Sequence, residues 1–224
     1  MLFRSFEARV LGRWPSVGSY SVWNELLWAE ALKQKPIPDA PFTLSCDVAR
    51  FGDDFTSIMG GYGGCAVHWE THNGWDTVQT TGRLIQLANE HGNELNKIPI
   101  KVDDDGIGGG VTDQGRAAGY NFIGCSGAHS AMEKDGYPNK RSESWFVGTE
   151  MCADGRIDLS RLPEEALSKL RRQAMAPTWK LDSQGRRVVE PKADTKKRIG
   201  RSPDDMDAFN LLLSIELPPM RGSI

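Results

Sequence analysis

The sequence predicts a mixed α/β fold in which helices cover a sheet. Three strand-like runs follow one another after residue 41, helical and strand-like segments then alternate, and mostly helical segments complete the chain. With 224 residues, of which 39% are hydrophobic and 25% charged, the chain can bury one sizeable core. We expect residues 1–40 to form a linker arm, residues 41–217 the domain, and residues 218–224 a C-terminal tail.

The first three strands are predicted to form an antiparallel meander. Residues 42–46 are a short apolar-rich run that ends at Asp47, and residues 55–59 and 65–70 have the composition of two further strands. The glycine-rich segment 60–64 is a turn that suits antiparallel neighbours.

Helix and strand alternate in the middle of the chain. Residues 77–91 carry apolar side chains at helical spacing, and residues 98–102 form a strand that ends at an aspartate. The proline at position 99 favours an edge strand or the start of a strand. A glycine-rich turn opens a helix over residues 106–118, and residues 120–124 form a short fifth strand.

The remaining elements are mostly helical. The amphipathic stretch 22–33 predicts a short helix that ends before Pro36. The last helix begins near Ser202-Pro203, since a serine cap followed by proline is a typical helix start. The later predicted elements are helices over residues 140–153, 163–174 and 204–216, and a hairpin over residues 179–189.

Several classes of protein are excluded by the sequence. No apolar run approaches the ~20 residues that span a bilayer, and the N-terminus has no apolar block of a secretory signal. The segment from Gly106 lacks the third glycine of a dinucleotide fingerprint, and no phosphate-binding loop motif occurs. His68 and His72 are expected to be surface residues and not metal ligands. The four cysteines form no CxxC pair and suit buried thiols: Cys46, Cys65, Cys125 and Cys152.

Charge is distributed unevenly along the chain. The net charge is -3 with a pI near 5.8, which does not by itself indicate a nucleic-acid binder. Residues 186–201, which we call the basic strip, nevertheless hold seven basic residues against two acidic ones. Acidic residues gather at positions 53–54, 103–105 and 204–207. A protein that grips phosphates and binds cations needs both features, although a charged run alone is more typical of a solvated loop.

Three aspartates stand out by their placement. Asp47 and Asp103 each end a predicted strand, and Asp207 lies on the last helix, one turn after Asp204 on the same face. If the two strands are neighbours, these carboxylates meet at one edge of the sheet. Crowded carboxylates stay ionised only around a cation, and Mg²⁺ or Mn²⁺ suits oxygen ligands. Two such ions make a centre that cuts phosphodiesters. Each aspartate alone would be a turn residue or helix cap.

Four motifs, in this order, resemble the nuclease domain of tailed-bacteriophage terminase large subunits. They are Cys46-Asp47-Val48-Ala49-Arg50-Phe51-Gly52-Asp53-Asp54; Val102-Asp103 with Gly106-Ile107-Gly108-Gly109-Gly110-Val111 and Asp113; Arg141-Ser142-Glu143; and Arg201-Ser202-Pro203-Asp204 with Asp207-Ala208. The segment 9–15 also resembles the stretch that joins the ATPase and nuclease halves in that family. The resemblance covers nearly the whole chain.

The resemblance implies a fold and a catalytic centre. The fold would be a ribonuclease H-like mixed five-stranded sheet flanked by helices, with an added hairpin. The catalytic acids would be Asp47, Asp103 and Asp207. Asp53 and Asp204 would be further ligands of two Mg²⁺ or Mn²⁺ ions, and the reaction would be cleavage of double-stranded DNA by metal-activated water during viral genome packaging.

The resemblance also implies partners. DNA would be met by the hairpin and the basic strip, through Arg187, Lys192, Lys196, Lys197, Arg198 and Arg201. Other partners would be an ATPase domain absent from this chain, a small terminase subunit and a portal, in the cytoplasm of a bacterial host and without a membrane. Three alternatives stay open: a junction resolvase or transposase of the same fold, a non-catalytic scaffold that binds DNA or a motor subunit, and a nucleotide-binding domain of the actin or sugar-kinase type.

Overall fold

A computed structural model describes residues 21–49, 54–92 and 97–214 of the chain. Its centre is a five-stranded sheet in the order β3-β2-β1-β4-β5. The strands are β1 (Phe42–Asp47), β2 (Thr56–Tyr62), β3 (Cys65–His72), β4 (Ile100–Asp103) and β5 (Phe122–Cys125). β1, β2 and β3 form the predicted antiparallel meander, whereas β4 and β5 run parallel to β1. The mixed α/β fold and the five-stranded sheet are therefore confirmed.

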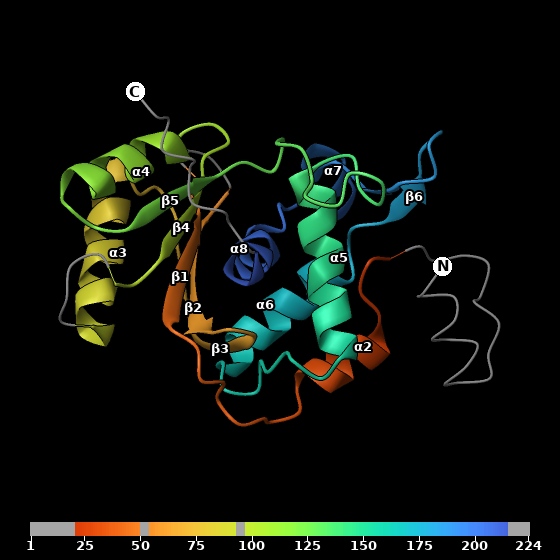
Figure 1. The fold of residues 1–224 in the computed structure, drawn as a ribbon, viewed down its shortest axis with the longest axis horizontal. Coiled ribbons are helices and arrows are strands. Elements are labelled where there is room, and N and C mark those ends of the chain that lie inside the picture. Colours follow the sequence, from red (N-terminus) through yellow and green to blue (C-terminus); the bar gives the residue numbers. More distant parts are fainter. Residues whose placement is uncertain (1–20, 50–53, 93–96, 215–224) are drawn as a thin grey trace.

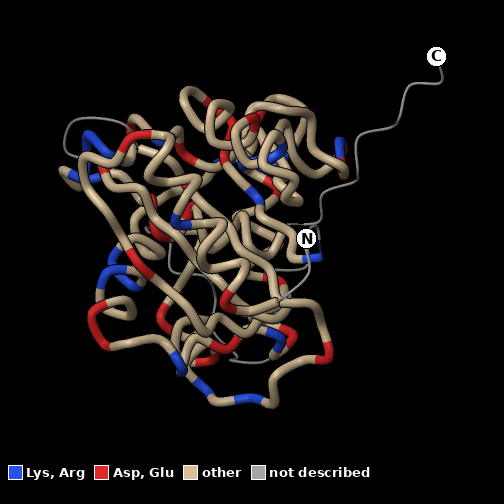
Figure 2. The backbone as a smooth tube through the Cα atoms, turned by 90° about the vertical axis from the view of Figure 1, so that its left-hand side faces the viewer, with Lys and Arg blue, Asp and Glu red and all other residues tan. Residues whose placement is uncertain are grey.

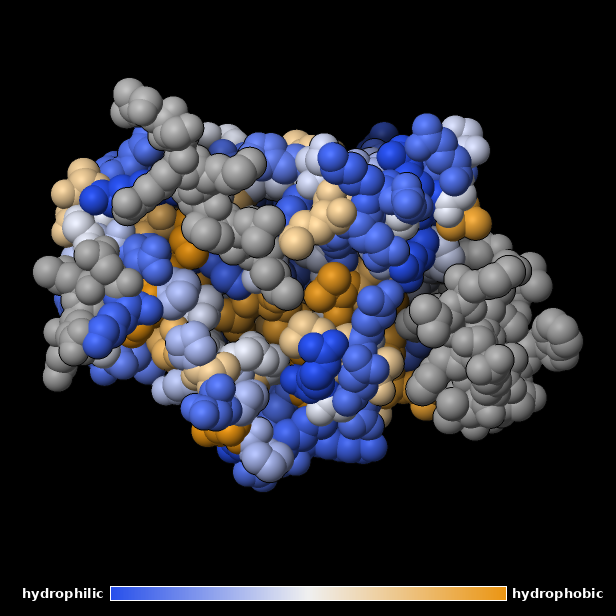
Figure 3. Space-filling view, viewed as in Figure 1, coloured by the Kyte–Doolittle hydropathy of each residue, from blue (hydrophilic) through white to orange (hydrophobic). Residues whose placement is uncertain are grey.

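Helices cover both faces of this sheet (Figure 1). On one face lie α3 (Thr77–His91) and α4 (Gly108–Ala117), and on the other lies α8 (Asp204–Leu213), which packs against β1, β2 and β4. α5 (Lys140–Ala153) and α6 (Glu164–Ala174) form an outer layer over α8. The remaining elements are α2 (Glu25–Ala31), α7 (Lys192–Ile199) and the hairpin of β6 (Trp179–Leu181) and β7 (Arg187–Val189). Hydrophobic side chains are visible at the centre of one face, between the sheet and α5 (Figure 3).

The two central strands are buried on both faces, as parallel neighbours between helical layers usually are. Leu44 and Cys46 of β1 point into the core beneath α3. The residue between them, Ser45, faces α8 and donates a hydrogen bond to the carbonyl of Ala208 at 2.7 Å. Because side chains alternate along a strand, Asp47 lies on the same face as Ser45, toward α8.

β4 follows the same pattern. Ile100 and Val102 join the core beneath α3 and α4. Lys101 faces α8 and donates from its buried Nζ to the carbonyls of Leu212 at 2.9 Å and Ser214 at 2.5 Å, at the C-terminal end of that helix. A cation stabilises the carbonyl end of a helix, so Lys101 fixes α8 on the sheet face to which alternation also directs Asp103.

Most predicted elements are confirmed to within a few residues, and the differences have local causes. The turn predicted at residues 60–64 starts later in the structure, because Gly60 and Gly61 belong to β2. A Cβ atom on Gly61 would lie 2.3 Å from the carbonyl oxygen of Cys65, so the strands approach too closely for any larger residue. The turn is at Gly63 and Gly64, and Gly63 has a φ of +55°.

The helical boundaries also differ in two places. The basic strip contains a helix that was not predicted, α7, which begins after Pro191 and ends at Gly200 with a left-handed φ of +74°. The predicted serine cap of α8 is wrong: Pro203 holds the cap position, no side chain caps the helix, and Ser202 is buried. α8 ends at Leu213, before the predicted 216. α2 is shorter than predicted and is capped by Asn24.

The described part of segment 1–40 packs on the domain. Val22, Trp23 and Trp28 are buried in the larger core cluster, and α2 contacts α5. The amide of Val22 donates to the carbonyl of Pro177 at 3.0 Å. These residues therefore contribute to the same core as residues that follow position 41.

Two minor expectations were also tested. All four cysteines are free and buried, as predicted. His68 and His72 are only partly exposed, since both flank the carboxylate of Glu70 at 3.5 and 3.3 Å on the edge strand β3. Within the described ranges, no helix is long and apolar enough to cross a bilayer.

Candidate active site

Four aspartates from three elements meet at one edge of the sheet. The last paired residues of β1 and β4 are Cys46 and Val102, so Asp47 and Asp103 stand next to each other at the carboxyl ends of two parallel strands. Asp204 and Asp207 occupy the first turns of α8, which packs across both strands. The convergence predicted for Asp47, Asp103 and Asp207 is what the chain topology produces.

The Lys192 ammonium lies where three of these carboxylates converge. Its Nζ is 2.6 Å from Asp47 Oδ2, 3.1 Å from Asp204 Oδ1 and 3.2 Å from Asp207 Oδ2. The three carboxylate side chains are less than a tenth exposed, while the Lys192 side chain is 35% exposed. Lys192 thus enters from the solvent side, at the first turn of α7, and supplies a positive charge to a buried acidic cluster.

A second cation holds Asp207 from the other side. Arg141 Nη1 donates to Asp207 Oδ1 at 2.6 Å, and the Trp145 indole donates to the same oxygen at 3.1 Å. Arg141 and Trp145 are four residues apart on α5, which places them on one face. The other oxygen, Asp207 Oδ2, is buried and lies 3.2 Å from the Lys192 ammonium, without a well-aligned hydrogen bond. Positive charge at this point stabilises a buried carboxylate oxygen.

Burial and mutual repulsion shift the pKa values in this cluster. Burial, together with the nearby acids, raises the pKa of Asp47 well above its ordinary value, although Lys192 opposes the shift. Burial likewise raises the pKa of Asp103, to about 6. Burial also acts on Asp207, but Arg141 and Lys192 outweigh it and lower its pKa. Four carboxylates therefore share two cations, so the cluster has more negative than positive charge.

These residues fit a divalent cation by their chemistry. The donors are carboxylate oxygens, which hard ions such as Mg²⁺ and Mn²⁺ prefer. In the part of the chain that the structure describes, no group of three or more His, Cys, Asp or Glu side chains is arranged so that it could hold a metal ion. The Lys192 ammonium lies at the point where the carboxylates of Asp47, Asp204 and Asp207 converge.

The neighbouring acids have other partners. Asp205 points away from Asp207 on α8 and accepts hydrogen bonds from Ser57, Trp69 and Gln173 at 2.7–2.9 Å. These three bonds occupy its carboxylate, so Asp205 is a structural residue. The carboxylates of Asp104 and Asp105 accept from Thr112 and Ser126 respectively. Asp53, predicted as a metal ligand, lies outside the described residues.

The predicted DNA-binding residues separate into two groups. Four already have partners: Arg187 pairs with Glu150 and lies over Tyr137 and Phe146, Lys196 pairs with Asp54, Arg198 pairs with Glu190, and Lys192 lies in the acidic cluster. Lys197 and Arg201 are exposed and make no ion pair within the described ranges. Acidic and basic positions are interspersed along the backbone (Figure 2), so no broad basic face is seen from that side.

Sequence reasoning did not find Lys192, Arg141 or Trp145 as partners of the acids. Lys192 was assigned to DNA because it belongs to the basic strip, and nothing in the sequence links it to Asp47, 145 residues away. Arg141 belongs to the Arg141-Ser142-Glu143 motif, but the sequence assigned it no role in the site. The one available signal was its four-residue spacing from Trp145, which is also ordinary in helices.

Comparisons with known proteins bear on the fold. No protein-family model matches the chain, and no curated protein matches it. Among solved structures, it is similar to the nuclease domain of the large terminase subunit gp2 of bacterial virus Sf6, with 16% identity, a TM-score of 0.72, and coverage of 88% of this chain and 100% of that one.

Two further structures agree. A variant of the Sf6 domain with manganese and beta-thujaplicinol has 15% identity and a TM-score of 0.69, with coverage of 88% and 100%. The large terminase nuclease of thermophilic phage G20c with bound magnesium has 12% identity and a TM-score of 0.58, with coverage of 89% and 98%. The chain therefore has the ribonuclease H-like fold of phage large terminase nuclease domains.

Proposed function

We propose that this chain is a metal-dependent endonuclease that cuts double-stranded viral DNA during genome packaging, as the nuclease part of a terminase large subunit in an infected bacterium. The observation that carries the proposal is the cluster of Asp47, Asp103, Asp204 and Asp207, in which four carboxylates share only the Lys192 and Arg141 cations and burial raises the pKa of Asp47. The fold shared with terminase nuclease domains supports the same conclusion.

Each residue has a distinct part in the proposed reaction. Asp47, Asp103 and Asp207, with Asp204 beside them, would hold two Mg²⁺ or Mn²⁺ ions. Such ions activate water and neutralise charge on the phosphate and the leaving oxygen. Arg141 and Trp145 keep Asp207 Oδ1 engaged, which directs Oδ2 toward the centre. Partners that orient a metal ligand typically contribute ~10–100-fold in affinity or activity.

The direct test is plasmid cleavage by the wild-type chain in Mn²⁺, in Mg²⁺ and in EDTA. We expect linear and nicked products in the two metals and none in EDTA. Asp47→Asn should remove cleavage. Asp39→Asn should not, because Asp39 is an exposed aspartate that precedes the opposite end of β1. Equal activity in EDTA and Mn²⁺, or equal loss in both variants, would contradict the proposal.

A non-catalytic scaffold is the second candidate, and one observation favours it. The Lys192 ammonium already neutralises part of the acidic cluster, as a site that no longer binds metal would require. A scaffold of this kind should bind DNA and show no Mn²⁺-dependent cleavage. A junction-resolving nuclease would instead prefer four-way junctions over linear duplex, which the same assay can compare.

The stability of a Lys192→Met variant, with and without Mn²⁺, distinguishes the metal-dependent nuclease from the non-catalytic scaffold. Without metal, the substitution leaves three buried carboxylates around an apolar side chain, and we expect a loss of about 1–3 kcal/mol of unfolding free energy, discounted for the partly exposed lysine. If the cluster binds metal, Mn²⁺ should raise the melting temperature of this variant more than that of the wild type. Thermal unfolding in EDTA and in Mn²⁺ measures both effects.

Lys196→Met is the matched control, because Lys196 lies on the same helix and pairs with the more exposed Asp54. A surface pair of this kind contributes about 0–1 kcal/mol. If Lys192→Met and Lys196→Met unfold alike and neither responds to Mn²⁺, Lys192 does not stand in for a metal ion.

A further inference from the structure

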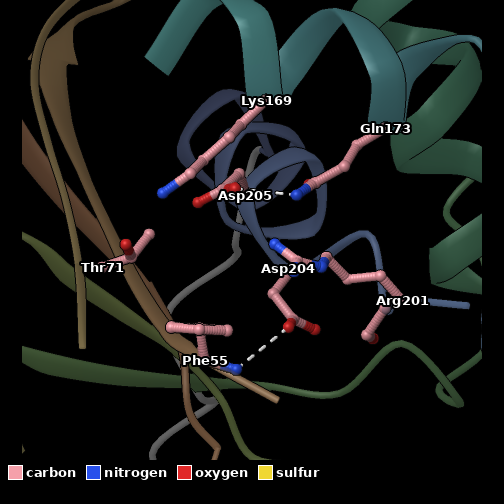
Figure 4. A pocket seen from close by; sticks show the side chains of 8 residues that line it. Phe55, Thr71, Lys169, Gln173, Arg201, Asp204 and Asp205 are labelled. Carbon is pink, nitrogen blue, oxygen red and sulfur yellow. Dashed lines mark hydrogen bonds between the residues drawn. The ribbon is translucent and has the colours of Figure 1, made fainter. Parts of the chain in front are cut away.

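Two neighbouring pockets lie between the acidic cluster and α6, and together we call them the cleft. The inner one is a small pocket of about 20 Å³ beside Asp204 and Asp205. Figure 4 shows Lys169 and Gln173 reaching into it from α6, with Phe55 and Thr71 on the opposite side. The amide of Phe55 donates to Asp204 Oδ2 at 3.2 Å, which places the wall of this pocket in direct contact with the cluster.

The outer part of the cleft is larger and lined by arginines. It has a volume of about 270 Å³. Its lining residues are Arg172, Gln173, Ile199, Gly200 and Arg201. Gln173 and Arg201 line both parts. The two pockets are therefore neighbours, and no acidic residue lines the outer one.

The two arginines of the outer cleft lack counterions. Arg172 and Arg201 are exposed, and neither forms an ion pair within residues 21–49, 54–92 and 97–214. Their neighbours on α6 differ, because Arg171 pairs with Glu25 at 2.6 Å and Lys169 pairs with Glu165 at 2.8 Å. Unpaired positive charge on α6 is thus confined to the side that faces the cleft.

The local backbone brings the two arginines to the same cleft. α7 ends at Gly200, whose left-handed φ of +74° reverses the chain immediately before Arg201. The Arg201 guanidinium then lies over the Phe55 ring, 5.8 Å from its centroid. Arg172 approaches from the last turn of α6. Planar guanidinium groups present paired N–H donors that match phosphate oxygens.

We propose that this outer cleft binds a backbone phosphate of the DNA strand, next to the phosphodiester at the acidic cluster. Arg172 and Arg201 are its contact residues, and Arg172 is a DNA-binding residue that the basic strip does not include. The proposal rests on the proposed nuclease function, which supplies the strand. Because the contact is to phosphate, it positions the strand without selecting a base sequence.

The test measures binding of the full chain to a fluorescent 30-base-pair duplex in EDTA, by anisotropy over a range of NaCl concentrations. Each lost phosphate contact lowers the slope of log affinity against log salt by about 1. We expect this change for Arg172→Gln. Arg172→Lys should keep most of the slope. Arg171→Gln is the matched control, since Arg171 pairs with Glu25, and it should retain the wild-type slope.

The outcomes separate this inference from the nuclease proposal. A wild-type slope for Arg172→Gln, in a variant whose melting temperature is unchanged, overturns the cleft as a phosphate site. The same decrease in Arg171→Gln and Arg172→Gln overturns it as well, because it would indicate only general charge. A decrease confined to Arg172→Gln supports the cleft, and absence of Mn²⁺-dependent cleavage by the wild type would then contradict the nuclease proposal alone.

Discussion

Cleavage of supercoiled plasmid in Mn²⁺ is expected to fall roughly 10³-fold when Asp207 is replaced by asparagine. Asp207 is the acid with the most built-in support, since Arg141 and Trp145 hold one oxygen and leave the other toward the centre. The substitution removes a negative charge and places an amide group in a site suited to a cation. Initial rates of nicking, measured at saturating Mn²⁺, give the size of the effect.

Asp205→Asn is the control on the same helix, and its effect should be of a different kind. The Asp205 carboxylate acts only as an acceptor, of hydrogen bonds donated by Ser57, Trp69 and Gln173. An asparagine NH₂ group would face a donor there, which costs about 1–3 kcal/mol of unfolding free energy. We expect a lower melting temperature with cleavage retained below it. If Asp207→Asn instead loses stability and keeps its rate, the assignment of the two aspartates is reversed.

Asp103→Asn is expected to stabilise the chain in the absence of metal by about 2 kcal/mol above pH 6, which is the ~3 kcal/mol of the full pKa shift reduced because Asp103 is partly exposed. Burial raises the pKa of Asp103 to about 6 from an ordinary 3.8. A carboxyl with a raised pKa in the folded state destabilises the fold when it ionises. The wild type therefore loses stability as the pH rises from about 4 to 6, and asparagine avoids this loss. The expected shift in melting temperature is roughly 4–8 °C at pH 7.5.

Two conditions test whether ionisation of Asp103 destabilises the fold. Well below pH 3.8 the Asp103 carboxyl is protonated in both the folded and the unfolded state, so the difference between wild type and variant should vanish. In Mn²⁺ at pH 7.5 the wild type should recover stability through binding and the variant should recover less. Differential scanning fluorimetry at several pH values, in EDTA and in Mn²⁺, measures both. A variant less stable than the wild type at pH 7.5 in EDTA would show that the ionised Asp103 carboxylate does not destabilise the fold.

The sequence was sufficient to predict the acidic edge of the sheet. Asp47 and Asp103 end strands, and strands that run parallel bring their ends to one edge, so the only missing fact was that β1 and β4 are neighbours. The face of α8 was also predictable, because three-residue spacing groups Asp204 with Asp207 and leaves out Asp205. Periodicity and strand alternation are local rules, and these residues obey them.

The cations could not be predicted because they depend on tertiary contacts. Lys192 reaches Asp47 from α7, a helix with one buried residue, Thr195, and hence no apolar periodicity to reveal it. The flanking Pro191 and Gly200 were the available signals for this helix. Arg172 was overlooked for the opposite reason, since α6 is a regular amphipathic helix and its arginine looks like an ordinary surface residue until the cleft is seen.

Lys101, the buried lysine of β4 that contacts the C-terminal end of α8, limits how the length of this helix can change. Lys101 donates hydrogen bonds to the last carbonyls of α8, and Ser45 donates one to the carbonyl of Ala208 in its middle. These bonds fix the position and the rotation of α8 on the sheet. A single residue inserted between Asp207 and Leu212 would rotate the first turn by about 100°, swinging both acids away from β1. The number of residues between Asp207 and Leu212 is therefore fixed.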